Sequence, residues 1–287
     1  MKWGLSTAGV MALLMATLSP SIGAQWPTYP TPGVPRTADG KPNLEAPAPR
    51  TADGKVDFSG IWMRGGGGGG GAGGGGRGRG GPPAPTTTPD GIPLSQFFEV
   101  AGRGNPLPIQ PWAAELKKKR MADNNKDNPD VWCLPIGLMQ YHNHGQPRQM
   151  VQTKNLMLIT YESNYGLRYI YLDGRPAPDN DPTPWWFGYS RGWFEGDTLV
   201  VETTHFLGDE RAGWLDVNGS PYTDALKMTE RFRRPNFGTL EIDVTIDDAK
   251  AYTKPFTVRV NQRIMVDQEM IEFICNENER STEHIEK

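Results

Sequence analysis

The stretch "GTLEIDVTIDD", residues 238–248, decides the fold class. Apolar and polar residues alternate along it without a break. This period of two is typical of a β-strand with one buried face, whereas a helix repeats its apolar positions roughly every 3.6 residues. We therefore expect a strand here, with Glu241 and Asp243 on its solvated side. The apolar residues on the other side are Leu240, Ile242, Val244 and Ile246.

Other stretches with a strand-like pattern bring the total to about ten. Glycine-containing turns such as "LDGRP", "FEGDT" and "RPNFGT" separate several of them. Short turns of this kind favour antiparallel neighbours. We therefore predict an all-β antiparallel meander, closed as a barrel because closure removes exposed edges, with a β-sandwich as the alternative. The further strands are expected at 58–63, 148–153, 156–162, 167–173, 189–196, 198–206, 227–234, 256–266 and 270–277.

One short helix is expected near residues 111–122. Pro111 suits the first helical position, and "AAEL" continues a helix start. The basic run Lys117 to Arg120 is interpreted as a solvated face of this helix rather than as a recruitment patch.

The N-terminus has the regions of a secretory signal peptide. A charged start is followed by an apolar run and by the small-residue ending "IGA", which predicts cleavage near Ala24. The apolar run is shorter than the roughly 20 residues that span a bilayer, so we expect no transmembrane segment. The mature chain would be periplasmic or extracellular. Its 29 Lys and Arg against 33 Asp and Glu give a net charge of −4, which argues against a nucleic-acid partner.

The composition divides the mature chain into unequal parts. Residues 25–57 are rich in Pro, repeat "RTADGK" at 36 and 50, and are expected to form a disordered leader. Residues 58–280 are expected to form one barrel domain, followed by a tail at 281–287. A Gly-rich insertion at 65–91 interrupts that domain, with 14 glycines among residues 65–81.

The two cysteines, Cys133 and Cys275, predict a disulfide in an exported chain. A thiol nucleophile is the less favoured alternative.

"GIW" at 60–62, on the first expected strand, resembles the G-x-W motif of lipocalins. That resemblance implies that an arginine from a late strand packs over Trp62, and Arg259 or Arg263 is the candidate. The stretches "RTADGKVDFSGIW", "CLPIG", "WFEGDTLVVET", "ERFRR", "AYTKPF" and "CNENE" resemble an uncharacterised family of exported bacterial proteins. The resemblance implies one exported domain and no particular activity.

Charged and aromatic residues suggest a ligand site. Arg168 alternates in phase with Ile170, and Glu230 in phase with Met228, so both charges enter the barrel if these apolar residues face inward. An Arg–Glu pair or a ligand carboxylate would then satisfy them. Aromatic residues gather at 185–194, where they either fill the core or border a cavity mouth. The candidate ligand-binding residues are Arg168, Trp185, Trp186, Tyr189, Trp193, His205 and Glu230.

"QYHNHG", residues 140–145, places two histidines one residue apart. In an extended segment His142 and His144 would share a face, and His205 is the third candidate ligand for zinc. Glu202, Asp173 and Glu162 are carboxylate alternatives for the third ligand. We expect no cofactor, and we keep the zinc site as the less favoured alternative because no established metal-binding spacing is present.

Three functional hypotheses remain open. The first is an exported protein that binds a small apolar or carbohydrate-like molecule in the barrel. The second is a lyase, isomerase or hydrolase that uses His142 or His144, assisted by Tyr161 or Glu202. The third is an interaction protein that contacts the cell envelope through its leader.

Overall fold

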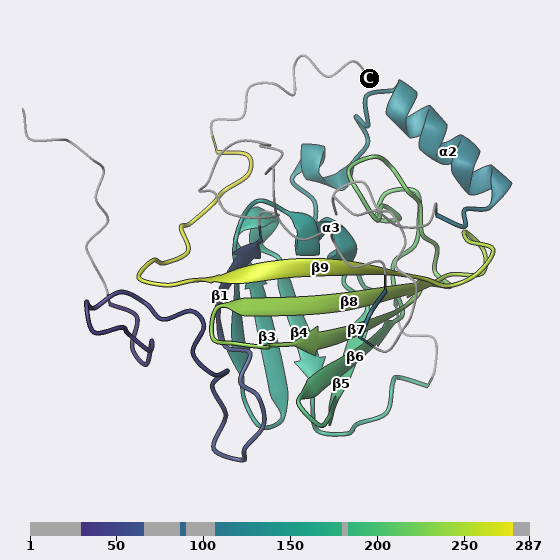
Figure 1. The fold of residues 1–287 in the computed structure, drawn as a ribbon. Helices are drawn as coiled ribbons and strands as arrows, with labels where there is room; N and C mark the ends of the chain where they lie inside the picture. The colour runs from purple at the N-terminus through teal and green to yellow at the C-terminus, as the bar shows by residue number, and fades with distance from the viewer. Residues whose placement is uncertain (1–29, 66–86, 90–106, 180–182, 278–287) are drawn as a thin grey trace, which may run out of the picture.

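The structure, a computed structural model, describes residues 30–65, 87–89, 107–179 and 183–277 (Figure 1). Within these ranges nine strands form one closed barrel, in which each strand is hydrogen-bonded to the next and β9 returns to β1. The fold is all-β and a barrel, as the alternation predicts, and not a sandwich. The strands are β1 Gly60–Arg64, β2 Arg148–Gln152, β3 Leu156–Tyr161, β4 Leu167–Tyr171, β5 Tyr189–Glu195, β6 Thr198–Thr204, β7 Lys227–Arg233, β8 Thr239–Asp247 and β9 Phe256–Met265.

The tenth expected strand, at 270–277, is not a strand in the described structure. This C-terminal segment is instead fixed by side-chain contacts. The backbone N–H of Ile271 donates a hydrogen bond to Glu162 at 3.1 Å. The predicted disulfide between Cys133 and Cys275 is present and closes a loop with a sequence separation of 142.

One junction of the barrel departs from the predicted meander, because β4 and β5 are parallel. The residues between them, 172–188, form a connection long enough to return to the starting end of the sheet, whereas the "LDGRP" stretch predicts a tight reversal. The register at this junction links Ile170 with Ser190 and Tyr171 with Arg191. Few backbone pairs therefore hold β4 against β5.

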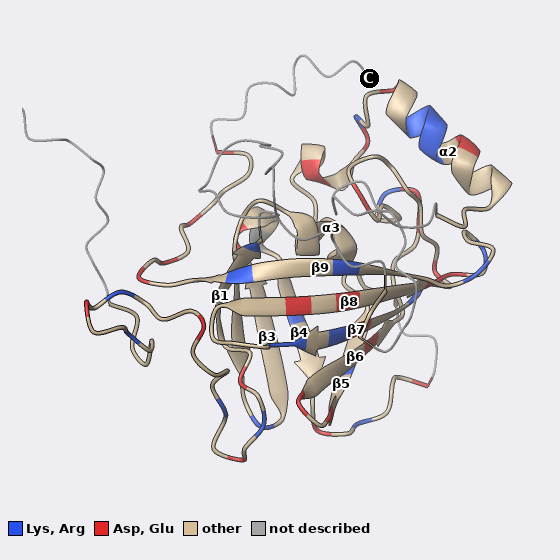
Figure 2. Cartoon of the chain, in the orientation of Figure 1, with Lys and Arg blue, Asp and Glu red and all other residues tan. Residues whose placement is uncertain are grey.

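The inner face of the barrel follows the predicted alternation. On β8 the four apolar residues are fully buried. The outer face departs from expectation at Asp243, which is 2 % exposed. Arg259 donates hydrogen bonds to this carboxylate at 2.6 and 2.7 Å, and Arg233 contacts it as well. Acidic segments of β8 lie beside basic segments of β9 (Figure 2). Asp243 is thus covered by its neighbours on the outer surface.

Two α-helices lie at one end of the barrel (Figure 1). The helix α2, Pro111–Ala122, starts at Pro111 as predicted, and α3 spans Leu138–Asn143. The prediction that Arg120 belongs to a solvated face is wrong, because this residue is 8 % exposed. Its guanidinium stacks over the Trp214 ring at 3.9 Å and donates to the carbonyl of Gly213. Two 3-10 turns, η1 Pro129–Trp132 with four residues and η2 Ser163–Tyr165 with three, complete the helical elements of the described residues.

Trp62 is buried and has an arginine over its ring, as the lipocalin resemblance implies, but the arginine is Arg234 at 4.8 Å. The predictions of Arg259 and Arg263 are wrong, since both lie on the outer face of β9. Arg234 also donates to the backbone oxygens of Asp57 and Phe237, at 2.5 and 2.7 Å. It therefore joins the chain before β1 to the turn between β7 and β8.

The prediction of a disordered leader is wrong for residues 30–57, which lie beside the barrel (Figure 1). Each "RTADGK" copy folds into a small hairpin, with a bridge from Arg36 to Pro42 in one and from Arg50 to Val56 in the other. The first arginine of each copy forms an ion pair with the barrel domain. Arg36 pairs with Asp267 at 2.6 Å, and Arg50 pairs with Asp197 at 2.7 Å. Each copy of the repeat thus holds the N-terminal segment against the barrel domain through one ion pair.

The predicted signal peptide, most of the Gly-rich insertion and the tail at 281–287 lie outside the described residues. None of the helices in the described ranges has the length and apolar character needed to cross a bilayer.

Candidate functional site

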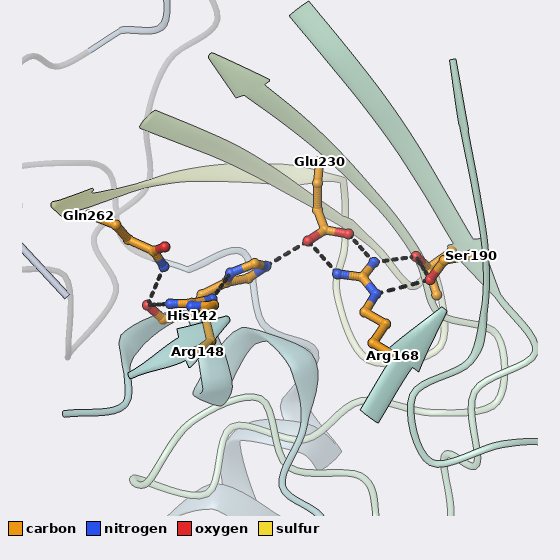
Figure 3. Close-up of polar contacts among 7 residues, drawn as sticks. His142, Arg148, Arg168, Ser190, Glu230 and Gln262 are labelled. Atoms are coloured by element: carbon orange, nitrogen blue, oxygen red, sulfur yellow. Dashed lines mark hydrogen bonds and ion pairs between the residues drawn. The ribbon is translucent and has the colours of Figure 1, made fainter. Parts of the chain in front are cut away.

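The predicted inward charges, Arg168 on β4 and Glu230 on β7, meet inside the barrel (Figure 3). Both are at most 1 % exposed. Arg168 Nη1 donates to Glu230 Oε1 at 2.9 Å, and Nη2 contacts Oε2. The same guanidinium donates to Ser190 at 3.0 Å and to Thr203 at 2.9 Å. Arg168 therefore connects β4 with β5, β6 and β7, across the junction that has few backbone pairs.

A histidine from α3 extends this network. His142 is fully buried, and its Nε2 lies 2.6 Å from Glu230 Oε1. On the other side of the ring, Arg148 Nη1 lies 2.7 Å from Nδ1, while Nη2 donates to the His142 carbonyl at 2.9 Å. Gln262 on β9 donates to that same carbonyl at 3.1 Å. Figure 3 shows one polar chain that runs from Gln262 to Ser190.

The helix α3 is held close to the rest of the chain, which fixes the position of His142. Every residue of α3 is buried. The residue before it is Gly137, where a side chain would collide with the backbone oxygen of Trp214. Glycine is thus required for this close approach. The histidine pair was expected in an extended segment, whereas His142 lies in the helix α3 and His144 is the extended residue that follows it.

The hydrogen bonds assign the histidine tautomer. A guanidinium only donates, so His142 Nδ1 must accept from Arg148. The proton then lies on Nε2, which donates to the Glu230 carboxylate. Both ring nitrogens are occupied, and the ring is neutral in this arrangement.

The titration behaviour agrees with this assignment. Burial lowers the pKa of His142 to about 4, with Glu230 opposing the shift and the two arginines adding to it. Burial alone would raise the pKa of Glu230, but Arg168 and His142 outweigh it and lower that pKa to about 2. At neutral pH the pair is a neutral imidazole and a carboxylate.

The charges in this interior do not balance. Glu230 is one anion, whereas Arg148 and Arg168 are two cations. Burial lowers the pKa of Arg148 to about 10, which leaves it protonated at neutral pH. Within the described residues no carboxylate forms an ion pair with Arg148, whose hydrogen bonds go to neutral atoms of His142. The interior thus carries one excess positive charge.

Several buried polar atoms, some beside this charge and others on α3, have no hydrogen-bond partner among the described residues. Tyr161 faces Arg148 across the β2–β3 pairing, with its ring 5.9 Å from the guanidinium. Although the Tyr161 hydroxyl lies near Arg168, it makes no hydrogen bond of good geometry within the described structure. On α3, Gln140 and Asn143 are three positions apart and share a side of the helix. The unpartnered atoms are Arg148 Nε, Tyr161 Oη, Gln262 Oε1, Gln140 Oε1 and Nε2, and Asn143 Nδ2.

The predicted zinc set does not form. His144 ends α3, faces Asp130 at 3.7 Å and accepts from the N–H of Gln146 at 3.4 Å. His205 follows β6 with a φ of 60°, which turns it away from the inner face and against Trp185. In the described part of the chain, no group of three or more His, Cys, Asp or Glu side chains is arranged to hold a metal ion.

The other predicted catalytic and carboxylate residues divide between the two sides of the barrel wall. Tyr161 points inward, stacks on Tyr141 at 4.1 Å between ring centroids, and belongs to the interior site. Glu202 lies on the outer face and pairs with Arg191 at 2.8 Å. Asp173 is also exposed and pairs with Arg175. Glu162 holds the C-terminal segment.

The aromatic candidates lie outside the barrel. Trp185 and Trp193 are 40 % and 45 % exposed, and Tyr189 stacks on Tyr171 at 5.2 Å. Trp186 is partly buried. Trp193 lines an open groove of about 400 Å³ together with Lys55, Gln152, Asn155 and Asp173. These aromatic residues therefore form an outer surface that is separate from the interior network.

Sequence reasoning missed Arg148 and Gln262, although the same alternation rule would have found them. Arg148 is in phase with the buried Met150, and Gln262 is in phase with Val260 and Ile264. Comparison of this chain with protein-family models, curated proteins and solved structures finds no match.

Proposed function

We propose that this protein binds a small polar molecule inside the barrel, at the end covered by α3. The observation that carries the proposal is the group of buried polar atoms without partners beside Arg148. A buried donor or acceptor that is left unsatisfied costs roughly 1–3 kcal/mol. A ligand that contacts several of them would recover this free energy, because each new hydrogen bond replaces a missing one.

The location of these atoms supports one shared site. Arg148 and Gln262 both lie within about 3 Å of the His142 carbonyl oxygen, at 2.9 and 3.1 Å. Tyr161 is the cross-strand neighbour of Arg148. The barrel wall on one side and α3 on the other enclose this group. We therefore propose a small polar ligand here in place of the apolar or carbohydrate-like ligand that the sequence suggested.

The enzyme hypothesis has less support than binding. A general base needs a free lone pair that faces its substrate. The one lone pair of the neutral His142 ring, on Nδ1, accepts from Arg148, and the ring is fully buried. Glu202, proposed as its helper, lies on the opposite face of the wall. His142 is therefore better suited to positioning Arg148 and Glu230 than to proton transfer.

A second candidate is a carbohydrate site at the Trp193 groove. A half-exposed indole can stack on the apolar face of a sugar, and amide, carboxylate and ammonium groups can bind its hydroxyls. The groove brings Trp193 together with Asn155, Asp173 and Lys55. Envelope contact through the leader has less support, because Arg36 and Arg50 are engaged with the barrel domain. We keep export to the periplasm or outside as part of the proposal.

The two sites are distinguished by a thermal-shift screen of small polar compounds and sugars on three proteins. Wild type is compared with Arg148→Met in the interior and Trp193→Ala in the groove. The proposal predicts stabilising compounds that act on wild type and Trp193→Ala but not on Arg148→Met. Compounds that lose their effect only in Trp193→Ala would contradict it in favour of the groove.

A further inference from the structure

The charges and hydrogen-bonding groups of the interior site restrict the chemical class of its ligand. This inference rests on the proposed binding function. The site holds Arg148, Arg168 and Glu230, of which the last two neutralise each other. Arg148 is 1 % exposed and has no counter-ion among the described residues. An unpaired buried cation is among the least favourable arrangements in a protein interior. A ligand with one negative charge would correct it.

The free edge of Arg148 points to a carboxylate. Its two terminal nitrogens are each oriented by His142, one toward Nδ1 and one toward the carbonyl oxygen. Of the five N–H donors this leaves three, the N–H of Nε and the second hydrogen of each terminal nitrogen. Two parallel donors on a planar fork match the two oxygens of a carboxylate.

Gln262 adds a second requirement. Its amide nitrogen must face the His142 carbonyl, because a carbonyl oxygen only accepts hydrogen bonds. The orientation of the amide is thereby assigned, and Oε1 is an acceptor without a partner in the described structure. A ligand that satisfies both groups has a hydrogen-bond donor next to its carboxylate.

The positive charge of the site determines which hydrogen-bond donor the ligand can carry. An ammonium group would add a third positive charge beside Arg148 and Arg168, whereas a hydroxyl donates without adding charge. The side chains of Arg148, Tyr161 and Gln262 are also at most 4 % exposed, which favours a compact molecule. We infer that the interior site recognises a small 2-hydroxycarboxylate, with the carboxylate on Arg148 and the hydroxyl on Gln262.

The test compares four small probes on the mature chain by isothermal titration calorimetry, one of which is chloride, an anion with neither a carboxylate nor a hydroxyl. Glycolate has both groups, acetate lacks the hydroxyl, and ethylene glycol lacks the charge. We expect glycolate to bind about tenfold more tightly than acetate, since an unpaired acceptor is costly, and ethylene glycol not to bind. Equal binding of ethylene glycol and glycolate, or equal binding of chloride and glycolate, would overturn the inference.

Two variants of Gln262 locate the contacts. Gln262→Met should lower the affinity for glycolate to that for acetate. Gln262→Glu should abolish binding of both, because the new carboxylate supplies the missing negative charge; it also loses the donor to the His142 carbonyl, so ligand binding and not stability is the readout. Unchanged glycolate binding in Gln262→Glu contradicts the assignment. These variants keep Arg148 and its contacts with His142, so the test does not depend on a variant that loses the network.

Arginine variants give the matched control. Arg148→Met should lose glycolate binding, whereas Arg191→Met, which removes an arginine from the outer face of β5, should retain it. If neutral compounds stabilise the protein through the interior site and no carboxylate binds, the proposed function stands and this inference fails. If no compound of either kind binds there, both fail.

Discussion

His142 and Glu230 are 88 positions apart in the sequence, and their side chains meet inside the barrel with 2.6 Å between Nε2 and Oε1. This contact joins α3 to β7. Through Arg168 it continues to Ser190 on β5 and Thr203 on β6, across the parallel junction. The Glu230 carboxylate thus connects α3 with the junction of β4 and β5, which has few backbone pairs.

Glu230→Gln should destabilise the protein by about 3–5 kcal/mol, because it leaves the buried Arg168 without its carboxylate partner. Urea unfolding measures the difference. The control is Glu202→Gln, which breaks a partly exposed pair with Arg191 and should cost less than about 1 kcal/mol. Similar losses of unfolding free energy in the two variants would show that the buried Glu230 pair stabilises the fold no more than the partly exposed Glu202 pair.

Stability should fall as the pH is lowered from about 6.5. The pKa values of His142 and Glu230 in the folded chain, about 4 and about 2, lie below their ordinary values of 6.5 and 4.5. The unfolded chain therefore binds more protons, and acid favours unfolding. The contribution of His142 should be lost between pH 6.5 and 4, and that of Glu230 between pH 4.5 and 2. Unfolding free energies at pH 7.5, 6, 5 and 4 check this.

The unfolding free energy should therefore decrease, and not increase, as the pH falls from 6.5 to 4. Each contribution should amount to at most roughly 3.5 kcal/mol, given about 1.4 kcal/mol per pKa unit, and the coupling of the two groups makes their sum smaller than twice that value. A stability that stays constant or rises between pH 6.5 and 4 would mean that His142 is not held neutral in the folded protein.

Alternation in the sequence predicted the strands and the inward charges, because it depends on local chain geometry. Leu240 to Ile246 on β8 and the pair of Arg168 and Glu230 are such cases. The same rule places Arg259 and Arg263 on the outer face of β9, so it argues against them as the arginine over Trp62.

Tertiary contacts decide the features that alternation missed. The segment at His142 has no side-chain cap that marks a helix start, and its helix forms where six residues are buried against the rest of the chain. The parallel pairing of β4 and β5 depends on the path of residues 172–188, which no local pattern shows. His205 leaves its predicted face because the backbone takes a positive φ there.

Arg234→Met should cost about 2–3 kcal/mol, because it removes charge-assisted hydrogen bonds to Asp57 and Phe237 together with the contact over Trp62. Arg263→Met, on the outer face of β9, should change stability by less than about 0.5 kcal/mol. Thermal and urea unfolding of both variants measure the difference. The assignment of Arg234 as the partner of Trp62 fails if the two losses are equal.

Replacement of Cys133 and Cys275 by serine should lower the unfolding free energy by roughly 4–5 kcal/mol, because the disulfide closes a loop with a sequence separation of 142. Urea unfolding of the double variant is compared with that of the oxidised wild type. A loss below about 1 kcal/mol would contradict the idea that the disulfide lowers the conformational entropy of the unfolded chain by closing this loop.

Native mass spectrometry of the chain, purified from cells without added ligands, tests the central claim most directly. The account predicts a bound small molecule at about one per chain in wild type and Trp193→Ala, and its loss in a folded Arg148→Met. A wild-type spectrum of the bare chain, together with a mass that shifts for none of the screened compounds, would contradict a binding site inside the barrel.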